Sequence, residues 1–181
     1  MRSWVMTPDD AEFAAFYRRH RAACLRAVIA ATGDPPAAED LVAEGFTRAW
    51  TAWRTVSRHP APHAWVVRTA LNAGVSSWRR RRREVPLEAP GRAPVATDRG
   101  AGTVPDVAQD HLVDPVLLSA LRRLPARQRE VVALRIVLDL DTDTTARVLG
   151  IAAGTVTSHL HRAMSTLRSQ LVSADTQEAP R

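Results

Sequence analysis

The chain has 181 residues, a formal net charge of +6 and a hydrophobic content of 45%. This composition is typical of a soluble globular protein with one or two small domains, and it excludes wholesale disorder. The single cysteine, Cys24, excludes an internal disulfide and a cysteine-based zinc site and favours a reducing compartment. No apolar run reaches the ~20 residues that would cross a bilayer, so we expect a cytoplasmic protein without a membrane partner.

All 25 basic residues are arginines, and they are distributed unevenly along the chain. Residues 1–83 carry 14 arginines and seven acidic residues, residues 84–114 carry two and six, and residues 115–181 carry nine and six. Two basic segments that flank an acidic one favour two polyanion-binding modules joined by a linker.

The first basic segment predicts three amphipathic helices. The first helix begins at the capping residue Thr7, has proline at its first position and ends near Gly33. The second begins at Asp34 and carries apolar residues at three- and four-residue steps for about four turns, as far as Trp53. The third, which contains Trp65 near its start, runs into a cluster of five arginines.

The acidic segment, residues 84–114, lacks periodicity and contains prolines and glycines that break regular structure, so we expect a linker. At roughly 3.3 Å per residue this linker spans up to about 100 Å, so the flanking domains need not touch. Periodicity returns at Asp114, where a capping residue and a proline begin another helix. Three further helices are expected to begin near Pro125, Asp141 and Ala153.

No segment shows the alternation of a β-strand, so the sequence predicts an all-α fold. We expect two small helical domains, residues 7–83 and residues 115–172, separated by the acidic linker of residues 84–114. The first is expected to be a helical bundle with an aromatic seam.

The second domain contains a helix-turn-helix pattern between Thr142 and Arg168. The apolar residues of its last helix fall within one arc, and they are Val156, Leu160, Ala163 and Leu167. A step of 100° per residue directs mostly small and polar residues outward, namely Gly154, Thr155, Ser158, His161, Arg162 and Ser165. Such groups fit the front of a helix in the major groove. An interior helical hairpin is the alternative, but the turn, the small residues and the basic charge favour DNA binding.

The helix from Trp65 to Arg83 combines tryptophans with an arginine run. Tryptophan stacks on unpaired bases and arginines follow phosphates, which suits single-stranded or melted DNA. The same pattern has a purely structural explanation, in which the tryptophans pack in the core and the arginine run is a solvated helix end. This segment alone therefore does not decide between a binding and a structural role.

Four segments carry a more specific signal, and they are residues 38–50 (AEDLVAEGFTRAW), 64–72 (AWVVRTALN), 121–132 (LRRLPARQREVV) and 150–163 (GIAAGTVTSHLHRA). In this order they resemble the signatures of the extracytoplasmic-function type of bacterial RNA polymerase sigma factor, in the sigma-70 family. The resemblance covers nearly the whole chain outside the linker and the tails. Four ordered motifs are far more specific than any one of them.

The resemblance implies a promoter-specificity subunit that binds core RNA polymerase, recognises two promoter elements and supports promoter melting. It would dock on the clamp of the largest polymerase subunit through Glu39, Asp40, Glu44, Thr47 and Arg48. It would bind the melted minus-ten strand through Asn72, Ser76, Trp78, Arg79 and Arg80. It would read the minus-thirty-five element through Thr155, Ser158, His161 and Arg162. The flap of the second-largest subunit and an anti-sigma factor are further implied partners, and the acidic linker would run toward the active-site and RNA-exit channels.

Several positions depart from the family's pattern. They are Leu71 and Ser76 for a frequent Arg and Asp, Thr145 for a Glu, Ala152 for a capping Ser, and Thr157 and His159 for basic residues. Loss of two basic residues removes phosphate contacts, and loss of a cap typically costs ~1 kcal/mol. We therefore expect weaker autonomous binding of the minus-thirty-five element, with more of the binding carried by residues 64–83.

Two other functions remain open from the sequence. One is a polymerase-independent helix-turn-helix regulator, and the other is a sigma-like interaction protein that no longer acts in initiation. A metal site at His59 and His63, or at His159 and His161, is disfavoured because neither pair has acidic or thiol ligands nearby, so these histidines are expected at the surface. No arrangement of residues invites an enzymatic interpretation, and no cofactor is expected.

Overall fold

The computed structural model describes residues 7–84 and 114–178, and for residues 8, 75–84 and 173–178 it describes the backbone alone. Every regular element in these ranges is helical, which confirms the expected all-α class. The helices of the first range are α1 (Pro8–Thr32), α2 (Pro35–Thr51), α3 (Trp53–Val56) and α4 (Pro62–Glu84). Those of the second range are α5 (Pro115–Arg122), α6 (Ala126–Val132), the π-helical segment η1 (Ala133–Val137), α7 (Thr142–Leu149) and α8 (Ala153–Glu178).

Side-chain caps begin the helices at the expected positions. The Thr7 hydroxyl accepts from the Asp10 N–H at 3.2 Å, and the Asp10 carboxylate accepts from the Thr7 N–H at 2.7 Å. The carboxylates of Asp34, Asp114 and Asp141 likewise accept backbone N–H groups at the starts of α2, α5 and α7. These contacts satisfy donors that the first helical turn leaves unpaired, and they confirm the four predicted starts.

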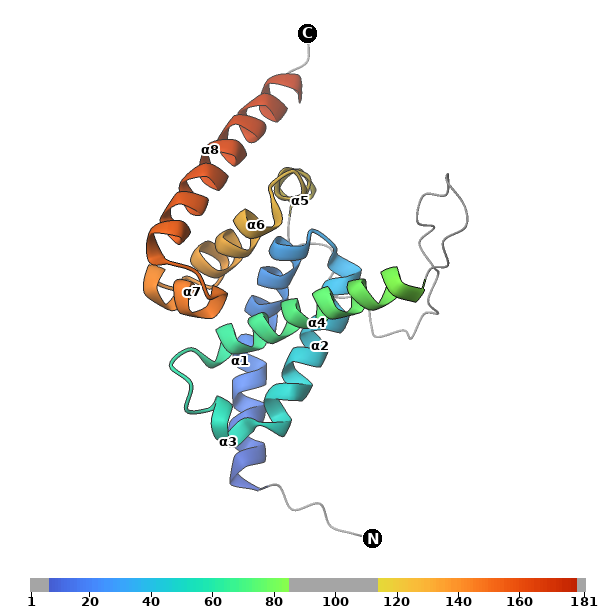
Figure 1. Cartoon of the computed structure of the whole chain (residues 1–181), viewed down its shortest axis with the longest axis vertical. Coiled ribbons are helices and arrows are strands. Elements are labelled where there is room, and N and C mark those ends of the chain that lie inside the picture. The colour runs from blue at the N-terminus through green and yellow to red at the C-terminus, as the bar shows by residue number, and fades with distance from the viewer. Residues whose placement is uncertain (1–6, 85–113, 179–181) are drawn as a thin grey trace.

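The N-terminal module, residues 7–84, is built around an aromatic core. Phe46 of α2 is only 3% exposed, and its ring lies 6.5 Å from that of Phe13 and 5.9 Å from that of Phe16. α4 packs closely on α2 because Gly45 has no side chain there. A Cβ at Gly45 would lie 2.9 Å from the Val66 carbonyl oxygen. Figure 1 shows α1 and α2 side by side, with α4 crossing them.

Two details of this module differ from the sequence prediction. α2 ends at Thr51, because the backbone at Ala52 leaves the helical region, and the separate turn of α3 directs the Trp53 ring onto the rings of Phe13 and Phe16. Trp50, expected in the apolar stripe, is 41% exposed. The next helix begins at Pro62, which the sequence places at the end of the short break before this helix.

The C-terminal module, residues 114–178, has an aliphatic core, with Leu121, Leu134 and Val156 among its buried side chains. The sequence predicts one continuous helix from Pro125, but the chain widens into η1, where the Leu138 N–H donates to the Ala133 carbonyl at 3.1 Å. The extra residue in this turn rotates Ile136 out of the core, and it is 54% exposed. Ile136 thus differs from the other apolar residues of the predicted helix, Val131, Val132, Leu134 and Leu138, which are buried.

The two modules pack against each other. The C-terminal part of α1 contacts α5, α6 and η1, and α7 lies beside α4 (Figure 1). The Arg122 Nε donates to the Gly33 carbonyl at 2.6 Å, and the Arg129 Nε donates to the Ala31 carbonyl at 2.9 Å. The modules therefore touch, which the sequence left open. The expected linker lies outside the described residues except at its two ends.

Candidate polymerase and nucleic-acid interface

A polar ridge runs along the outer face of α2. All five residues that the family resemblance assigns to polymerase binding are exposed there, namely Glu39, Asp40, Glu44, Thr47 and Arg48. The opposite face of α2 is fixed in the core by Val42, Phe46 and Ala49, which are buried. The ridge therefore cannot turn inward unless α2 leaves the aromatic core.

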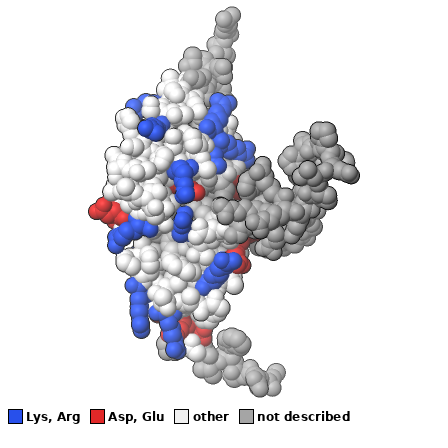
Figure 2. All heavy atoms as spheres, in the orientation of Figure 1, with Lys and Arg blue, Asp and Glu red and all other residues white. Residues whose placement is uncertain are grey.

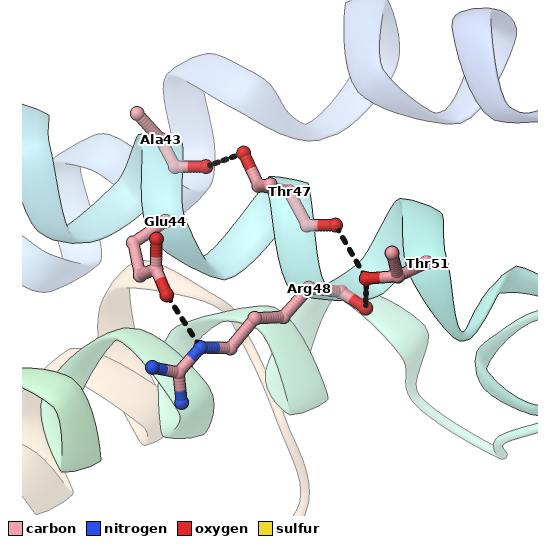
Figure 3. A network of polar contacts seen from close by, with 5 residues as sticks. All are labelled: Ala43, Glu44, Thr47, Arg48 and Thr51. Carbon is pink, nitrogen blue, oxygen red and sulfur yellow. Dashed lines mark hydrogen bonds and ion pairs between the residues drawn. The ribbon is translucent and has the colours of Figure 1, made fainter.

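Hydrogen bonds order the second half of this ridge, as Figure 3 shows. The Glu44 carboxylate accepts from the Arg48 Nε at 2.6 Å, four residues along the helix. The Thr47 hydroxyl donates to the Ala43 carbonyl, and the Thr51 hydroxyl donates to the Thr47 carbonyl, both at 2.9 Å. An exposed pair of this kind adds only about 0.3–0.5 kcal/mol to stability. Its main effect is to hold both side chains in place on the ridge.

A groove of about 230 Å³ adjoins the first half of the ridge, between α1 and α2. Glu39 and Asp40 line one wall, and Tyr17 and Arg21 of α1 line the other. The sequence pattern does not predict this contribution of α1. Tyr17 belongs to the apolar stripe of that helix, and its partial exposure depends on how far α1 and α2 are apart, which periodicity does not determine.

α4 carries the residues assigned to the melted strand. Asn72 is exposed on this helix. The positions of Ser76, Trp78, Arg79 and Arg80 lie on the same continuous helix, and their side chains fall outside the described part of the chain. Leu71, which departs from the family pattern, is buried in the core. Its side chain therefore packs inside the module and does not form part of the outer surface of α4.

The helix-turn-helix forms as the sequence predicts. α7 ends at Leu149 with Gly150 as its C-cap, and α8 begins at Ala153. Val156, Ala163 and Leu167 of α8 are buried, and Leu160 is half-buried. The four residues assigned to the minus-thirty-five element are all exposed, namely Thr155, Ser158, His161 and Arg162. The expected orientation of α8 is confirmed, and the DNA contacts of these side chains stay a prediction.

The two helices of this motif differ in how their first turns are capped. Hydrogen bonds from the Thr144 N–H and hydroxyl hold the pKa of Asp141 below its usual value at the start of α7. Ala152, at the start of α8, offers only its carbonyl, which accepts from the Thr155 N–H at 2.9 Å. Thr145 is fully buried, and its hydroxyl finds no hydrogen-bond partner among the described residues. Both departures from the family pattern, Ala152 and Thr145, therefore leave polar groups of the motif with fewer hydrogen bonds.

Both modules match known protein families. Residues 16–84 match the family model described as Sigma-70 region 2, and residues 116–167 match the one described as Sigma-70, region 4. The chain is 33% identical over 165 residues to the RNA polymerase sigma-E factor of Streptomyces coelicolor, covering 91% of this chain and 88% of that protein. The chain belongs to the sigma-70 family. It is also 32% identical over 174 residues to the ECF RNA polymerase sigma factor SigL of Mycobacterium tuberculosis, covering 93% and 94%.

Solved structures share the fold of this sigma factor. The sigma factor RpoE in complex with the anti-sigma factor NepR from Bartonella quintana superimposes with a TM-score of 0.67 at 24% identity, covering 88% of this chain and 96% of that one. CnrH in complex with the cytosolic domain of CnrY gives a TM-score of 0.61 at 24% identity, covering 91% and 90%. Among the described residues no helix is both long and apolar enough to span a bilayer. The matches to both regions identify a sigma subunit of RNA polymerase.

The surface of this sigma factor is basic on the face that Figure 2 shows. Arginine side chains are spread over both modules, and acidic side chains on this face are few. On α8 the exposed arginines are Arg162 and Arg168. This distribution suits a protein whose ligand is a polyanion.

An apolar groove of about 740 Å³ lies where α1 meets α5, η1 and α8. Three large apolar side chains of the C-terminal module line it and are exposed, namely Ile136 (54%), Met164 (40%) and Val172 (61%). Arg26 and Arg168 lie at its margin. Helical periodicity does not predict this groove, because it does not show that the widened turn of η1 exposes Ile136.

Of the histidines and the cysteine of this sigma factor, His20, His63 and Cys24 are partly or wholly packed. His63 stacks on His20, with ring centroids 5.0 Å apart and an angle of 8°, and it is half-buried at the surface where it was expected. Burial lowers the pKa of both rings, with smaller effects of Arg19 on His20 and of His20 and His59 on His63. Burial raises the pKa of Cys24 to about 12, as expected of a packing residue. No three His, Cys, Asp or Glu side chains gather as metal ligands in the described ranges.

Proposed function

We propose that the N-terminal module binds the polymerase clamp and the melted minus-ten strand and that the C-terminal module reads the duplex minus-thirty-five element. The observation that carries this proposal is that one chain presents both the ridge of α2 and an exposed helix-turn-helix. The protein acts in the cytoplasm, where core polymerase works, and catalyses no bond change itself.

The ridge of α2 is suited to a basic partner helix. Glu39 and Asp40 line the groove together with Arg21 and Tyr17, and Glu44 follows one turn later. The exposed carboxylates of the ridge therefore suit a partner surface that carries positive charge. The second half supplies a preformed hydrogen-bonding surface.

The two DNA-binding faces differ in what they offer. On α4, Asn72 supplies an amide for the edge of an unpaired base, and the positions of Trp78, Arg79 and Arg80 supply stacking and phosphate contacts. On α8, Thr155 and Ser158 are short enough for the helix to lie deep in the major groove. Arg162 and His161 then reach the base edges or the phosphates from the same face.

The apolar groove gives the C-terminal module a second docking surface. Its exposed apolar residues Ile136, Met164 and Val172 suit an apolar segment of the flap of the second-largest polymerase subunit. Both solved relatives named above are complexes with another protein, and the RpoE complex contains an anti-sigma factor. We propose a partner of the anti-sigma class for this chain as well.

The central test is reconstitution with core polymerase in run-off transcription over a genomic template library. We expect promoter-specific products, and their absence with every template would overturn the proposal. Glu44→Arg should reduce both the product and the affinity for core polymerase, because it breaks the pair with Arg48 and reverses a charge on the ridge. Glu12→Arg, which makes the same exchange at an exposed site on α1, is the matched control.

A second test addresses the C-terminal module. Arg162→Ala should weaken binding of a selected minus-thirty-five duplex, either reducing the salt slope by about 1 or relaxing the choice of one base by about 1–3 kcal/mol. Arg123→Ala removes an exposed arginine on another face of the same module and should leave both values unchanged. Equal effects of the two substitutions would remove α8 from the proposed recognition surface.

A further inference from the structure

Three of the six histidines of the chain lie where α4 begins on α1. His20 belongs to α1, His59 to the segment before α4 and His63 to the first turn of α4, and all three are half-buried. The His20 ring stacks on that of His63 at 5.0 Å and lies 4.9 Å from that of Phe16. The two stacked rings therefore join α1 to the start of α4, where Figure 1 shows the two helices crossing.

The hydrogen bond of His59 requires a neutral ring. Its Nδ1 accepts from the Ala61 N–H at 3.1 Å, and the Ala61 carbonyl accepts from the Trp65 N–H at 3.1 Å as α4 begins. Both nitrogens of an imidazolium ring carry protons, so this acceptor is lost when His59 is charged. Protonation would therefore leave the N–H of the buried Ala61 unpaired just before α4.

Positive charge is also unfavourable at the two stacked rings. His63 is the second residue of α4, where the helix carries partial positive charge, and the first turn contains no acidic residue to offset it. Burial, followed by the charge of Arg19 on His20 and of His20 and His59 on His63, lowers the pKa of both rings. No carboxylate among the described residues acts in the opposite direction. The stack is therefore stable only while its rings are neutral.

Cys24 joins the same two helices. It follows His20 by one turn of α1, it is fully buried, and its Sγ donates to the His63 carbonyl at 3.7 Å. Burial raises the pKa of Cys24 to about 12, so this thiol stays neutral in the range where histidines titrate. A thiol reagent reaches Cys24 only when the protein around it opens. Because it is the single cysteine of the chain, its reaction reports this opening alone.

We propose that His20, His59 and His63 form an acid-sensitive latch, which holds the start of α4 against α1 while the rings are neutral and releases it when they bind protons. Once released, His20 and His63 are solvated and their pKa values return to about 6.5. The released state therefore binds more protons than the closed state, so release is favoured as pH falls below about 6.5. α4 carries the residues assigned to the melted strand, so we expect release to weaken promoter opening, a consequence that rests on the proposed function.

The test is the reaction of Cys24 with a pyridyl disulfide in the full chain. The rate in the native chain is divided by the rate in urea-unfolded chain at the same pH, because the thiolate fraction itself changes with pH. We expect this ratio to rise roughly threefold or more from about pH 7.5 to about pH 5.5. An unchanged ratio would overturn the latch.

Hydrogen exchange separates release of α4 from unfolding of the whole module. Normalised to the unfolded chain in the same way, exchange in acid should rise at residues 65–69 of α4. It should stay low at residues 44–49 in the middle of α2. Equal increases in the two segments would show that the module unfolds as a unit, and a local latch would be excluded.

Glutamine at the three positions tests the role of protonation. It does not titrate, and at position 59 its side-chain oxygen can still accept from the Ala61 N–H. The triple variant, with His20→Gln, His59→Gln and His63→Gln, should lose most of the rise in acid. His59→Gln alone should lose part of it, so the test does not depend on folding of the triple variant.

The matched control is His159→Gln, which removes a half-buried histidine from the C-terminal module and should keep the full rise. Circular dichroism at each pH checks that every variant is folded. If folded glutamine variants show the same rise as the natural chain, protonation of these rings does not release α4, and the proposal is wrong.

Run-off transcription separates the latch from the proposed function. The natural chain and the triple variant are compared with the same core polymerase and template, so effects of pH on the polymerase cancel. We expect the product of the natural chain, relative to that of the variant, to fall about twofold from about pH 7.5 to about pH 6. A constant ratio, with Cys24 reactive in acid, would overturn the link to promoter opening but not the latch. No product from either chain at any pH would overturn the proposed function alone.

Discussion

The two modules of this sigma factor are stabilised in different ways. All of its aromatic residues, five Trp, three Phe and one Tyr, lie in the first 83 positions, and none follows. The helices α1, α2 and α4 have 25, 17 and 23 residues, whereas α5, α6 and α7 have 8, 7 and 8. Helices of two turns are not stable alone in water. The C-terminal module therefore depends more on helix caps and on its contact with α1.

The distribution of tryptophan allows unfolding of the two modules to be compared. Tryptophan fluorescence follows the N-terminal module alone, whereas circular dichroism follows the helices of both modules. If the contact at α1 couples the modules, the two unfolding curves coincide. Two separate transitions would show that the modules unfold independently.

The largest expected effect is removal of a central aromatic ring. Phe46→Ala should lower the free energy of unfolding by about 4 kcal/mol, because it leaves a cavity among Phe13, Phe16 and Trp53. Leu134→Ala, a buried aliphatic site in the other module, should cost about 3 kcal/mol. Urea titration followed by both signals measures the two losses. An Ala variant of Phe46 as stable as the natural chain would contradict the aromatic core.

A smaller effect is expected where α2 meets α4. Gly45→Ala places a Cβ 2.9 Å from the Val66 carbonyl, and because backbone must move, we expect a loss of about 2 kcal/mol. Gly74→Ala is the matched control, since its Cβ meets the end of the flexible Leu41 side chain at 3.1 Å. The control should be neutral or slightly stabilising, because alanine favours helix. Thermal unfolding monitored by fluorescence separates the two.

The C-terminal module can be strengthened at its uncapped helix. Ala152→Ser adds an acceptor at the start of α8 and should raise the free energy of unfolding by about 1 kcal/mol. Ala153→Ser puts the same hydroxyl one residue inside the helix and should bring no gain. The measurement is urea titration by circular dichroism. A gain in both variants, or in neither, would show that the missing cap is not what limits α8.

The smallest effects are differences in pH dependence. The lowered pKa values of His20 and His63 mean that the unfolded chain binds more protons, so stability of the N-terminal module falls as pH drops below about 6.5. The lowered pKa of Asp141 stabilises the C-terminal module above about pH 4, and this contribution is lost as pH falls further. The midpoints of urea unfolding at several pH values measure the pH dependence of both modules. His63→Gln and Asp141→Asn should each flatten the dependence in its own range.

Local features of the fold and of the site could be predicted from the sequence. Thr7, Asp34, Asp114 and Asp141 begin helices because their side chains satisfy N–H groups within three residues, which needs no tertiary information. The outward faces of α2 and α8 follow from helical periodicity in the same way. Their binding roles stay predictions, since no bound partner defines them.

Features that depend on packing could not be predicted. Periodicity places Trp50 and Ile136 on apolar faces, but it does not say how deep the neighbouring helix lies or where a turn widens. Arg122 and Arg129 belong to a motif typical of the family, yet nothing in that motif indicates that they bind carbonyl groups about 90 residues earlier. Long-range contacts of this kind follow from the shape of two surfaces rather than from local pattern.

The contact at the end of α1 also has a consequence for synthesis on the ribosome. Ala31 and Arg129 are 98 residues apart in sequence. At about 5–20 residues per second, the end of α1 leaves the ribosome about 5–20 s before the segment that covers it. During that time the nascent N-terminal module exposes an apolar face, and at this stage it is most open to wrong pairing with other chains.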